Sequence, residues 1–173
     1  MAGYGMENLP KKGPVIIASN HRSYIDPPII GSVVHRDFHF LAKKELFNFK
    51  PFGWFITKLN AHPLNRASGI AALRAAQEIL DENGVVILFP EGRRSPSDQL
   101  LKPKSGVGML ALKTGVPVVP AYIHNSGHLK EFKRVSVYFG VPIDPKKFKS
   151  YDALAEEVMA QIQKLKDQIQ PKI

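Results

Sequence analysis

The sequence predicts an α/β protein: a single domain with a layered αβα fold, in which helices flank a mostly parallel or mixed central sheet. Two observations lead to this prediction. Short runs rich in β-branched residues alternate along the chain with longer segments of helical period. The length of 173 residues, of which 44% are hydrophobic and 23% charged, suits one domain with a full hydrophobic core.

Five apolar runs are expected to be strands, because each is short and rich in β-branched or aromatic residues. The run at residues 85–89 is apolar throughout, as expected of a strand that is covered on both faces, and Asn83 and Gly84 before it mark the end of a helix. We therefore place it near the middle of the sheet. The five strands are expected at Val15–Ala18, Phe38–Ala42, Val85–Phe89, Val116–Ile123 and Val135–Phe139.

Two segments have the period of an amphipathic helix. The first runs from about Ser68, a suitable N-cap, to Glu82, with an apolar stripe formed by Ile70, Leu73, Ala76, Ile79 and Leu80. The second follows Ser150 and covers about residues 151–168, with an apolar stripe formed by Leu154, Val158, Ile162 and Leu165. Both stripes are typical of helices that pack on a core.

The chain is basic, with 24 Lys and Arg against 15 Asp and Glu and a net charge of +9. This charge indicates an anionic partner: nucleic acid, a phosphorylated metabolite or an acidic membrane surface. The absence of cysteine excludes disulfide scaffolds and thiolate catalysis. No apolar run approaches the ~20 residues that span a bilayer, and residues 1–10 do not resemble a signal peptide, so a cytoplasmic location is expected.

A polar segment, Asn20–Pro28, follows the first expected strand. If the chain turns within it, Asp26 can accept a hydrogen bond from the imidazole of His21 and fix its tautomer, which leaves the opposite ring nitrogen free to take a proton. The alternative is a locally bonded loop histidine, with Asp26 capping a helix that starts near Pro27. Ser23 is not expected to be an acylated nucleophile, because no Gly-x-Ser-x-Gly elbow presents it.

A second polar segment, Leu88–Ser95, begins where the apolar run at residues 85–89 ends. In open α/β sheets, ligands bind at the carboxyl ends of the strands. At such a place Arg94 can pair with a phosphate, Gly92 can let the backbone approach it, and Glu91 can accept from a ligand hydroxyl. A solvated turn with an exposed ion pair fits the composition equally well.

Basic and aromatic residues interleave in Lys43–Phe55. Such a segment suits a membrane interface, where aromatic rings lie at the level of the headgroups and Lys meets anionic lipid. It also suits base stacking in a protein that binds single-stranded nucleic acid. The remaining interpretation is an ordinary amphipathic segment whose aromatic side chains belong to the core.

No metal site is expected. Two histidine pairs have a spacing of four residues, which brings ligands together only on a helix: His35 with His39, and His124 with His128. His39 falls in an expected strand, and Gly127 interrupts the other pair. The chain also lacks the glycine-rich sequences that cradle nucleotide phosphates.

Four segments occur in a characteristic order. Residues 20–26 read N-H-R-S-Y-I-D, residues 42–66 run from A-K-K-E-L to P-L-N-R, residues 89–95 read F-P-E-G-R-R-S, and residues 116–121 read V-P-V-V-P-A. With the lead-in G-M-E-N-L-P at residues 5–10, they resemble the lysophosphatidic acid acyltransferase (1-acyl-sn-glycerol-3-phosphate acyltransferase, PlsC-type) family, whose blocks include N-H-x-x-x-x-D and F-P-E-G-T-R-S. The resemblance covers about residues 5–142, and position 93 holds Arg where the family usually has Thr.

The resemblance implies one acyltransferase catalytic domain over residues 1–173, with the fold of glycerolipid acyltransferases. The implied reaction moves a fatty acyl group from acyl-CoA or acyl carrier protein to the 2-hydroxyl of lysophosphatidic acid, which gives phosphatidic acid for phospholipid synthesis. His21 and Asp26 would form the general base, without a covalent intermediate. The implied substrate-binding residues are Lys43, Arg66, Glu91, Gly92 and Arg94.

The resemblance implies no metal and no other cofactor, because the thioester donor is a co-substrate. The implied partners are a lysophospholipid acceptor, the acyl donor and an anionic membrane surface, with peripheral attachment at the inner face of the membrane. The acceptor remains open among lysophosphatidic acid, glycerol 3-phosphate, dihydroxyacetone phosphate and lysolipids with larger headgroups.

Two other classes of function are kept as alternatives. A nucleic-acid-binding module would explain the net charge and the aromatic residues at 49–55, but it leaves His21 and Asp26 unexplained. The sequence has no recognised nucleic-acid-binding motif, so nucleic acid is not expected as a partner. A non-catalytic lipid-binding or tethering domain on the same fold is the second alternative.

Overall fold

The computed structural model of the chain describes residues 1–64, 69–131 and 133–169. Its centre is a seven-stranded sheet with the order β1-β7-β6-β2-β5-β3-β4. The pair β6 and β7 is antiparallel, and every other pair of neighbouring strands in the described sheet is parallel. The strands are β1 (Ala2–Tyr4), β2 (Val15–Ser19), β3 (Phe38–Lys43), β4 (Ala61–Leu64), β5 (Val85–Leu88), β6 (Val118–His124) and β7 (Ser136–Phe139).

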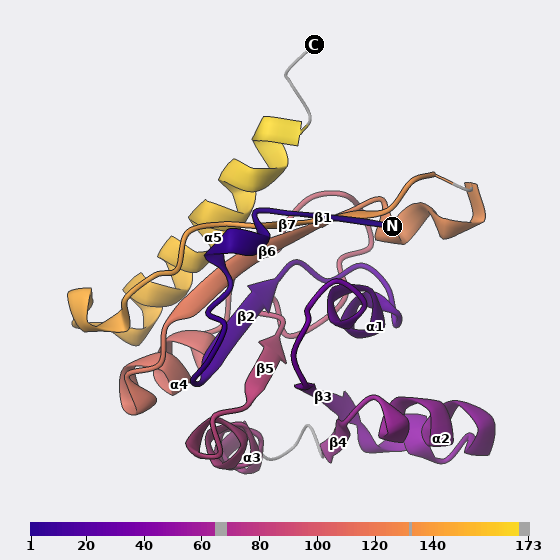
Figure 1. Ribbon diagram of the computed structural model, residues 1–173, viewed down its shortest axis with the longest axis horizontal. Helices are drawn as coiled ribbons and strands as arrows, with labels where there is room; N and C mark the ends of the chain where they lie inside the picture. Colours follow the sequence, from indigo (N-terminus) through magenta and orange to yellow (C-terminus); the bar gives the residue numbers. More distant parts are fainter. Residues whose placement is uncertain (65–68, 132, 170–173) are drawn as a thin grey trace.

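Helices cover both faces of this sheet, as Figure 1 shows with α1 and α2 on one side and α4 and α5 on the other. The α-helices are α1 (Asp26–Gly31), α2 (Lys50–Lys58), α3 (Gly69–Asp81), α4 (Gly106–Thr114) and α5 (Tyr151–Ile169). Short 3₁₀ helices lie at η1 (Met6–Asn8), η2 (Lys44–Phe47), η3 (Ser126–Glu131) and η4 (Pro145–Lys147). None of the described helices is both long enough and apolar enough to cross a membrane.

Alternating side chains of the strands build two hydrophobic cores, one on each face of the sheet. Ile17 of β2 lies in the core with Ile30 of α1 and Ile56 of α2. Its neighbour Ile16 lies in the opposite core, which includes side chains of α3, α4 and α5. Because successive residues of a strand point to opposite faces, an apolar run such as β2 can serve both cores. The predicted αβα fold with a mixed sheet is confirmed.

Several elements were not expected from the sequence, among them β1, β4 and α4. The strands β1 and β4 are short and lie at the two edges of the sheet, and β4 contains Pro63, which is tolerated at an edge. The helix α4 contains two glycines, which lowered its apparent helix propensity. One of them has a packing reason: a Cβ on Gly108 would lie 2.0 Å from the carbonyl oxygen of Tyr151 at the start of α5.

The parallel strands β2, β5 and β3 bring the segments that follow them to the same edge of the sheet. β2 and β5 pair in parallel with Ala18 opposite Leu88, and β5 also pairs with β3. Residues 20–26, 89–95 and 43–44 therefore meet at the carboxyl ends of neighbouring strands, where open α/β sheets bind ligands.

Candidate active site

His21 and Asp26 form the pair that the sequence predicts. His21 Nδ1 lies 2.8 Å from Asp26 Oδ2, so Nδ1–H donates to the carboxylate and Nε2 is the nitrogen that can accept a proton. The imidazole stacks on the ring of Phe89, with 4.0 Å between the ring centroids and 18° between the planes. The carboxylate and the stacked ring together fix the tautomer and the orientation of the imidazole.

The Asp26 carboxylate is fully buried and turned back toward the loop that precedes it. Its Oδ2 accepts hydrogen bonds from the backbone N–H groups of Arg22 at 2.6 Å and Ser23 at 2.7 Å, in addition to His21. The helix α1 has Ile25 as its N-cap and no side-chain capping bond. The alternative in which Asp26 only caps this helix is therefore wrong.

Glu91 ties the His21 loop to the loop after β5. His21 and Glu91 each lie three residues beyond the opposed pair Ala18 and Leu88, and Glu91 Oε1 accepts from the backbone N–H of His21 at 2.9 Å. Its Oε2 accepts from the N–H of Leu101 at 2.9 Å. Because the residue is only 2% exposed and both oxygens bind backbone, it holds loops together. This differs from the contact with a ligand hydroxyl that the sequence suggested.

Two more residues hold the His21 loop, and the sequence did not assign them a role. The side-chain amide of Asn20 accepts from Ile123 N at 2.7 Å and donates to Ile123 O at 3.1 Å, which fixes the loop to β6. Arg22 donates to the carbonyl of Ser95 at 3.0 Å, while Ser95 N donates to His21 O at 2.7 Å. These bonds join segments that are more than 70 residues apart, so residue spacing gave no signal for them.

A cavity of about 200 Å³ opens beside His21, with cations in its wall. Lys43 from the end of β3 lines it together with Arg93 and Arg94 from the loop after β5. The rest of the lining is largely apolar and includes Phe40, Leu41, Leu46, Phe52, Ile56 and Phe89. A proton acceptor, an anion-binding rim and an apolar wall therefore share one cavity. Arg93 was seen in the sequence only as a departure from a family pattern.

The structure also shows the surroundings of the other expected binding residues. Arg94 is exposed, and its guanidinium carbon lies 3.6 Å from the ring centroid of Tyr24, so it is held at the cavity wall. Gly92 has a φ of +67°, and a Cβ there would lie 2.9 Å from the side chain of Lys104, so glycine suits this turn. Arg66 lies outside the described residues.

Histidines elsewhere do not build a metal site among the described residues, where no group of three or more His, Asp or Glu side chains converges. His39 is instead paired with His62 across the neighbouring strands β3 and β4, with 3.0 Å between Nδ1 and Nε2. Burial lowers the pKa of His39, and the neighbouring His62 lowers it further.

The sequence profile of a protein family described as Acyltransferase matches residues 2–124. The chain belongs to this acyltransferase family. The resemblance in the sequence blocks is thereby confirmed, and the His21 loop, the 200 Å³ cavity and the Glu91 turn all fall within the matched residues.

Individual members of the acyltransferase family agree with this assignment. A 1-acyl-sn-glycerol-3-phosphate acyltransferase of Bacillus subtilis is 31% identical over 172 residues, which make up 95% of this chain and 85% of that protein. A chloroplastic 1-acyl-sn-glycerol-3-phosphate acyltransferase of Brassica napus is 33% identical over 129 residues, which make up 72% of this chain and 37% of that protein. This chain thus spans little more than a third of the plant relative.

A solved structure with the acyltransferase fold superposes on almost the whole chain. It is the crystal structure of the 1-acyl-sn-glycerophosphate acyltransferase PlsC from Thermotoga maritima, with a TM-score of 0.85 and 35% sequence identity. The superposition covers 99% of this chain and 73% of that chain. The arrangement of strands and helices around the site is therefore that of a known acyltransferase.

The Glu91→Gln variant is expected to lower the free energy of unfolding of the protein by about 1–3 kcal/mol. Burial raises the pKa of Glu91, while the hydrogen bonds from Leu101 and His21 oppose this shift. Glutamine removes the buried charge, but its amide nitrogen cannot accept from a backbone N–H, so one of the two N–H groups loses its acceptor. Urea unfolding of the two proteins measures the difference.

Glu78→Gln on α3 is the matched control, because Glu78 is exposed. We expect it to change the free energy of unfolding by less than about 0.5 kcal/mol. If Glu91→Gln were as stable as the parent protein, the role of Glu91 in joining the two loops would be refuted.

Proposed function

We propose that this chain transfers a fatty acyl group from an acyl thioester to the 2-hydroxyl of lysophosphatidic acid, giving phosphatidic acid. The observation that carries the proposal is His21, held 2.8 Å from the buried carboxylate of Asp26, in the wall of a cavity that three cations also line. The relatives from Bacillus subtilis and Thermotoga maritima are named for the same acyl acceptor.

In the proposed reaction His21 acts as a general base. As the acceptor's 2-hydroxyl oxygen attacks the thioester carbonyl, Nε2 takes the hydroxyl proton, and the buried carboxylate of Asp26 stabilises the resulting imidazolium. The tetrahedral intermediate then collapses, the carbon–sulfur bond breaks, and the thiolate leaves with the proton from His21. One ester forms for each thioester consumed, and no acyl-enzyme is needed. The thioester itself is the activated group, so the route calls for no resident cofactor.

The cations of the cavity are proposed to hold the acceptor phosphate while its hydroxyl meets His21. Lys43 at the end of β3 and Arg93 and Arg94 in the loop after β5 can approach one anion from different sides. Such alignment turns an encounter into a nearly unimolecular step. Arg66, which lies outside the described residues, is kept as a further candidate from the family resemblance. Gly92 supplies the turn that places Arg93 and Arg94.

A second hollow is proposed to hold the acyl chain. Its volume is about 510 Å³, and its lining is largely apolar, with Leu73 and Ala76 of α3 and Val107 and Met109 of α4 among the residues that form it. It reaches Leu41 and Phe89, which also line the cavity beside His21. An apolar chain in this hollow is therefore close to the reacting atoms. Acyl-CoA and acyl carrier protein both remain candidate donors.

The test is an acyl-transfer screen of the purified protein with both donors against a panel of acceptors. Lysophosphatidic acid is expected to give the highest kcat/KM, ahead of glycerol 3-phosphate, dihydroxyacetone phosphate and lysophosphatidylcholine. Preference for another phosphorylated acceptor would correct the substrate but not the reaction class. Release of free thiol with no acylated acceptor from any of them would overturn the proposal.

Arg94→Ala is expected to raise the KM for lysophosphatidic acid about tenfold or more, because a charge-assisted hydrogen bond to the phosphate is lost. The change in kcat should be smaller, since His21 and Asp26 are untouched. Initial rates at varied acceptor concentration measure both constants. Lys113→Ala on α4 is the control, because this exposed cation does not line the cavity and should leave both constants unaltered. Unchanged constants in Arg94→Ala would contradict the assignment.

The proposed substrates are amphiphiles, so we also propose that the protein works as a peripheral protein at an anionic membrane surface on the cytoplasmic side. The net charge of +9 supports attraction to such a surface.

A further inference from the structure

The outward side of α2 carries aromatic side chains that the core does not use. Phe49, at the N-cap of α2, is 68% exposed, Trp54 is 66% exposed and Phe55 is 43% exposed. We call Phe49, Trp54 and Phe55, together with the exposed Lys50 and Lys58, the outer face of α2. Scattered exposed apolar residues are ordinary, but three large exposed aromatic residues within seven positions concentrate apolar surface at this helix.

The other side of the same helix is already packed. Ile56 is 2% exposed and lies in the core on this face of the sheet. A Cβ on Gly53 would lie 2.6 Å from the carbonyl oxygen of Phe47, so α2 presses closely on the preceding 3₁₀ helix. The fold of the helix is therefore secured from within, and the outer aromatic side chains remain available to a partner.

The inner side of α2 is also a wall of the active-site cavity. Phe52 and Ile56 of α2 and Leu46 of η2 line that cavity together with His21 and Arg94. A partner that covers the outer face of α2 therefore lies one helix away from the reacting groups. A lipid partner in this position would bring the membrane to the side of the molecule where the acceptor must enter.

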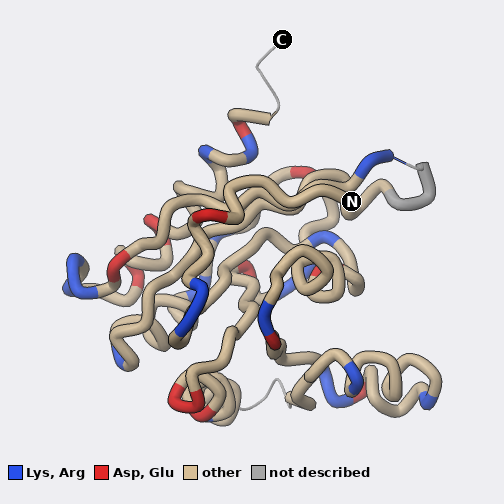
Figure 2. Tube along the Cα trace, in the orientation of Figure 1, with Lys and Arg blue, Asp and Glu red and all other residues tan. Residues whose placement is uncertain are grey.

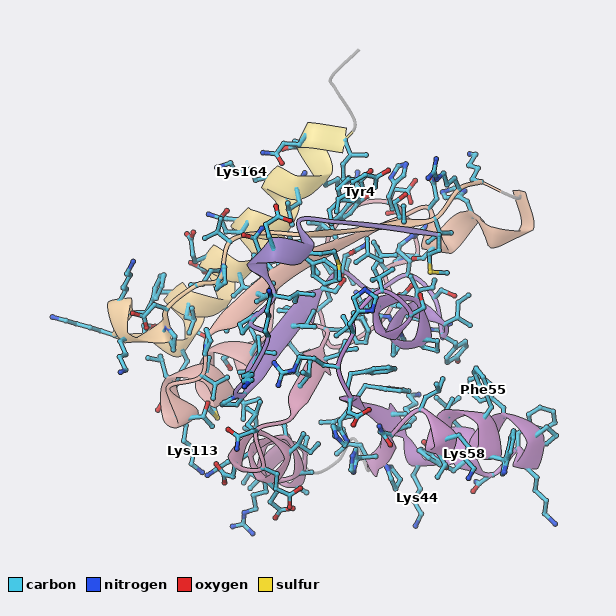
Figure 3. The ribbon with its side chains drawn as sticks, viewed as in Figure 1. Tyr4, Lys44, Phe55, Lys58, Lys113 and Lys164 are labelled. Atoms are coloured by element: carbon cyan, nitrogen blue, oxygen red, sulfur yellow. The ribbon has the colours of Figure 1, made fainter. Side chains whose placement is uncertain are left out.

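The charge of residues 43–58 indicates the chemistry of the partner. Between residues 43 and 58 there are four lysines, Lys43, Lys44, Lys50 and Lys58, and one acid, Glu45. Figure 2 shows basic positions around α2, and Figure 3 shows Lys44, Phe55 and Lys58 around this helix, away from the central sheet. Aromatic rings with interleaved lysines match the headgroup region of a bilayer that contains anionic lipid.

We propose that the outer face of α2 is the surface that docks onto an anionic lipid bilayer. Trp54, Phe49 and Phe55 enter the headgroup region, and Lys50 and Lys58 contact lipid phosphates. The biological purpose of this surface rests on the proposed function, because docking here presents the cavity to an acceptor that resides in the membrane. The lipid contact itself can be measured without any acyl transfer.

The chain contains a single tryptophan, Trp54, so its fluorescence reports on this face alone. Vesicles of phosphatidylcholine mixed with phosphatidylglycerol should shift the emission to shorter wavelength and protect it from iodide. Vesicles of phosphatidylcholine alone should do so much less. Lipids brominated near the headgroup should quench the emission more than lipids brominated at the chain end, because the helix lies in the interface.

Two variants keep the tryptophan as reporter. Phe49→Ala/Phe55→Ala removes apolar contact area, and Lys50→Glu/Lys58→Glu reverses the charge. Each should weaken binding to the anionic vesicles about tenfold or more. Lys113→Glu/Lys164→Glu makes the same change in net charge on α4 and α5, whose exposed lysines are labelled in Figure 3, and should weaken binding far less. Thermal unfolding checks that all variants remain folded.

Acyl-transfer assays distinguish the lipid-docking surface from the proposed acyltransferase function. With a short-chain lysophosphatidic acid dissolved as monomers, the α2 variants should retain the parent rate, whereas with the acceptor embedded in vesicles they should be slow. If no acceptor is acylated but the emission of Trp54 still shifts with anionic vesicles, the lipid-docking surface is supported and the proposed function is refuted.

Three results would overturn the lipid surface. The first is sedimentation with anionic vesicles without any change in Trp54 emission, and the second is no binding to these vesicles. In the third, sedimentation velocity shows a dimer without lipid, and Phe49→Ala/Phe55→Ala abolishes it, which would assign the outer face of α2 to a second copy of the chain.

Discussion

Replacing Asp26 by asparagine is expected to lower kcat by about 10²- to 10⁴-fold, the usual range for a general-base contribution. Asp26 Oδ2 accepts three N–H groups, and the single oxygen of asparagine can take the same place. The geometry of the loop should therefore survive. The variant loses the negative charge that, in the proposed reaction, stabilises the imidazolium after His21 has taken the hydroxyl proton. The acceptor KM should change little, because Asp26 is fully buried and does not line the cavity.

Steady-state acyl transfer with lysophosphatidic acid measures this effect, and thermal unfolding checks the fold. Asp98→Asn is the matched control. Asp98 lies near the same loops and pairs with Arg22 at 3.2 Å, but its side chain is 55% exposed and does not contact His21. We expect a small loss for Asp98→Asn. Near-full activity in Asp26→Asn would refute the role of Asp26.

Replacing His21 by alanine is expected to lower kcat at least as much, by about 10²- to 10⁴-fold, because the proposed proton acceptor itself is lost. The fold should tolerate the change, since Asp26 Oδ2 keeps two backbone donors at 2.6 and 2.7 Å. The stack of 4.0 Å between His21 and Phe89 is lost, which should lower stability modestly. Binding of lysophosphatidic acid should persist, because Lys43, Arg93 and Arg94 are intact.

The double variant His21→Ala/Asp26→Asn tests whether the two residues act as one unit. Residues that act as one unit are strongly non-additive, so the double variant should be about as slow as His21→Ala alone. Losses that multiply would show that the two residues act independently. A non-catalytic lipid-binding domain makes a different prediction, in which His21→Ala leaves the biological activity of the protein unaltered.

The strands were predictable where burial dictates residue type. β5 reads as an unbroken apolar run because helices cover both of its faces, and its sequence pattern places it correctly inside the sheet. β1 and β4 gave no such signal, because edge strands of three and four residues bury little and tolerate Pro63. The helix α4 was not predicted because Gly108 lowers its helix propensity. The reason for this glycine is the close packing of α5, which leaves no room for a side chain.

The candidate site was predictable where the pattern is local. His21 and Asp26 are five residues apart in a loop after a strand, which made their hydrogen bond possible, and the family resemblance of this local block led us to expect it. The part played by Glu91 depends on the register of β2 and β5, which places it beside the backbone of His21 and which no local pattern reveals. Arg93 likewise lines the cavity because the loop after β5 lies next to β3, and no local sequence pattern reveals this arrangement.

Following a labelled acyl group from the thioester to its product tests the proposed acyl transfer most directly. The purified protein is mixed with lysophosphatidic acid and a thioester that carries an isotope-labelled acyl chain, and free thiol and phosphatidic acid are followed together by mass spectrometry. We expect one phosphatidic acid for each thiol released, with the labelled chain on glycerol position 2 and the product all but absent with His21→Ala. Thiol release without phosphatidic acid, or equal product from His21→Ala, would contradict the proposed acyl transfer by His21 and Asp26.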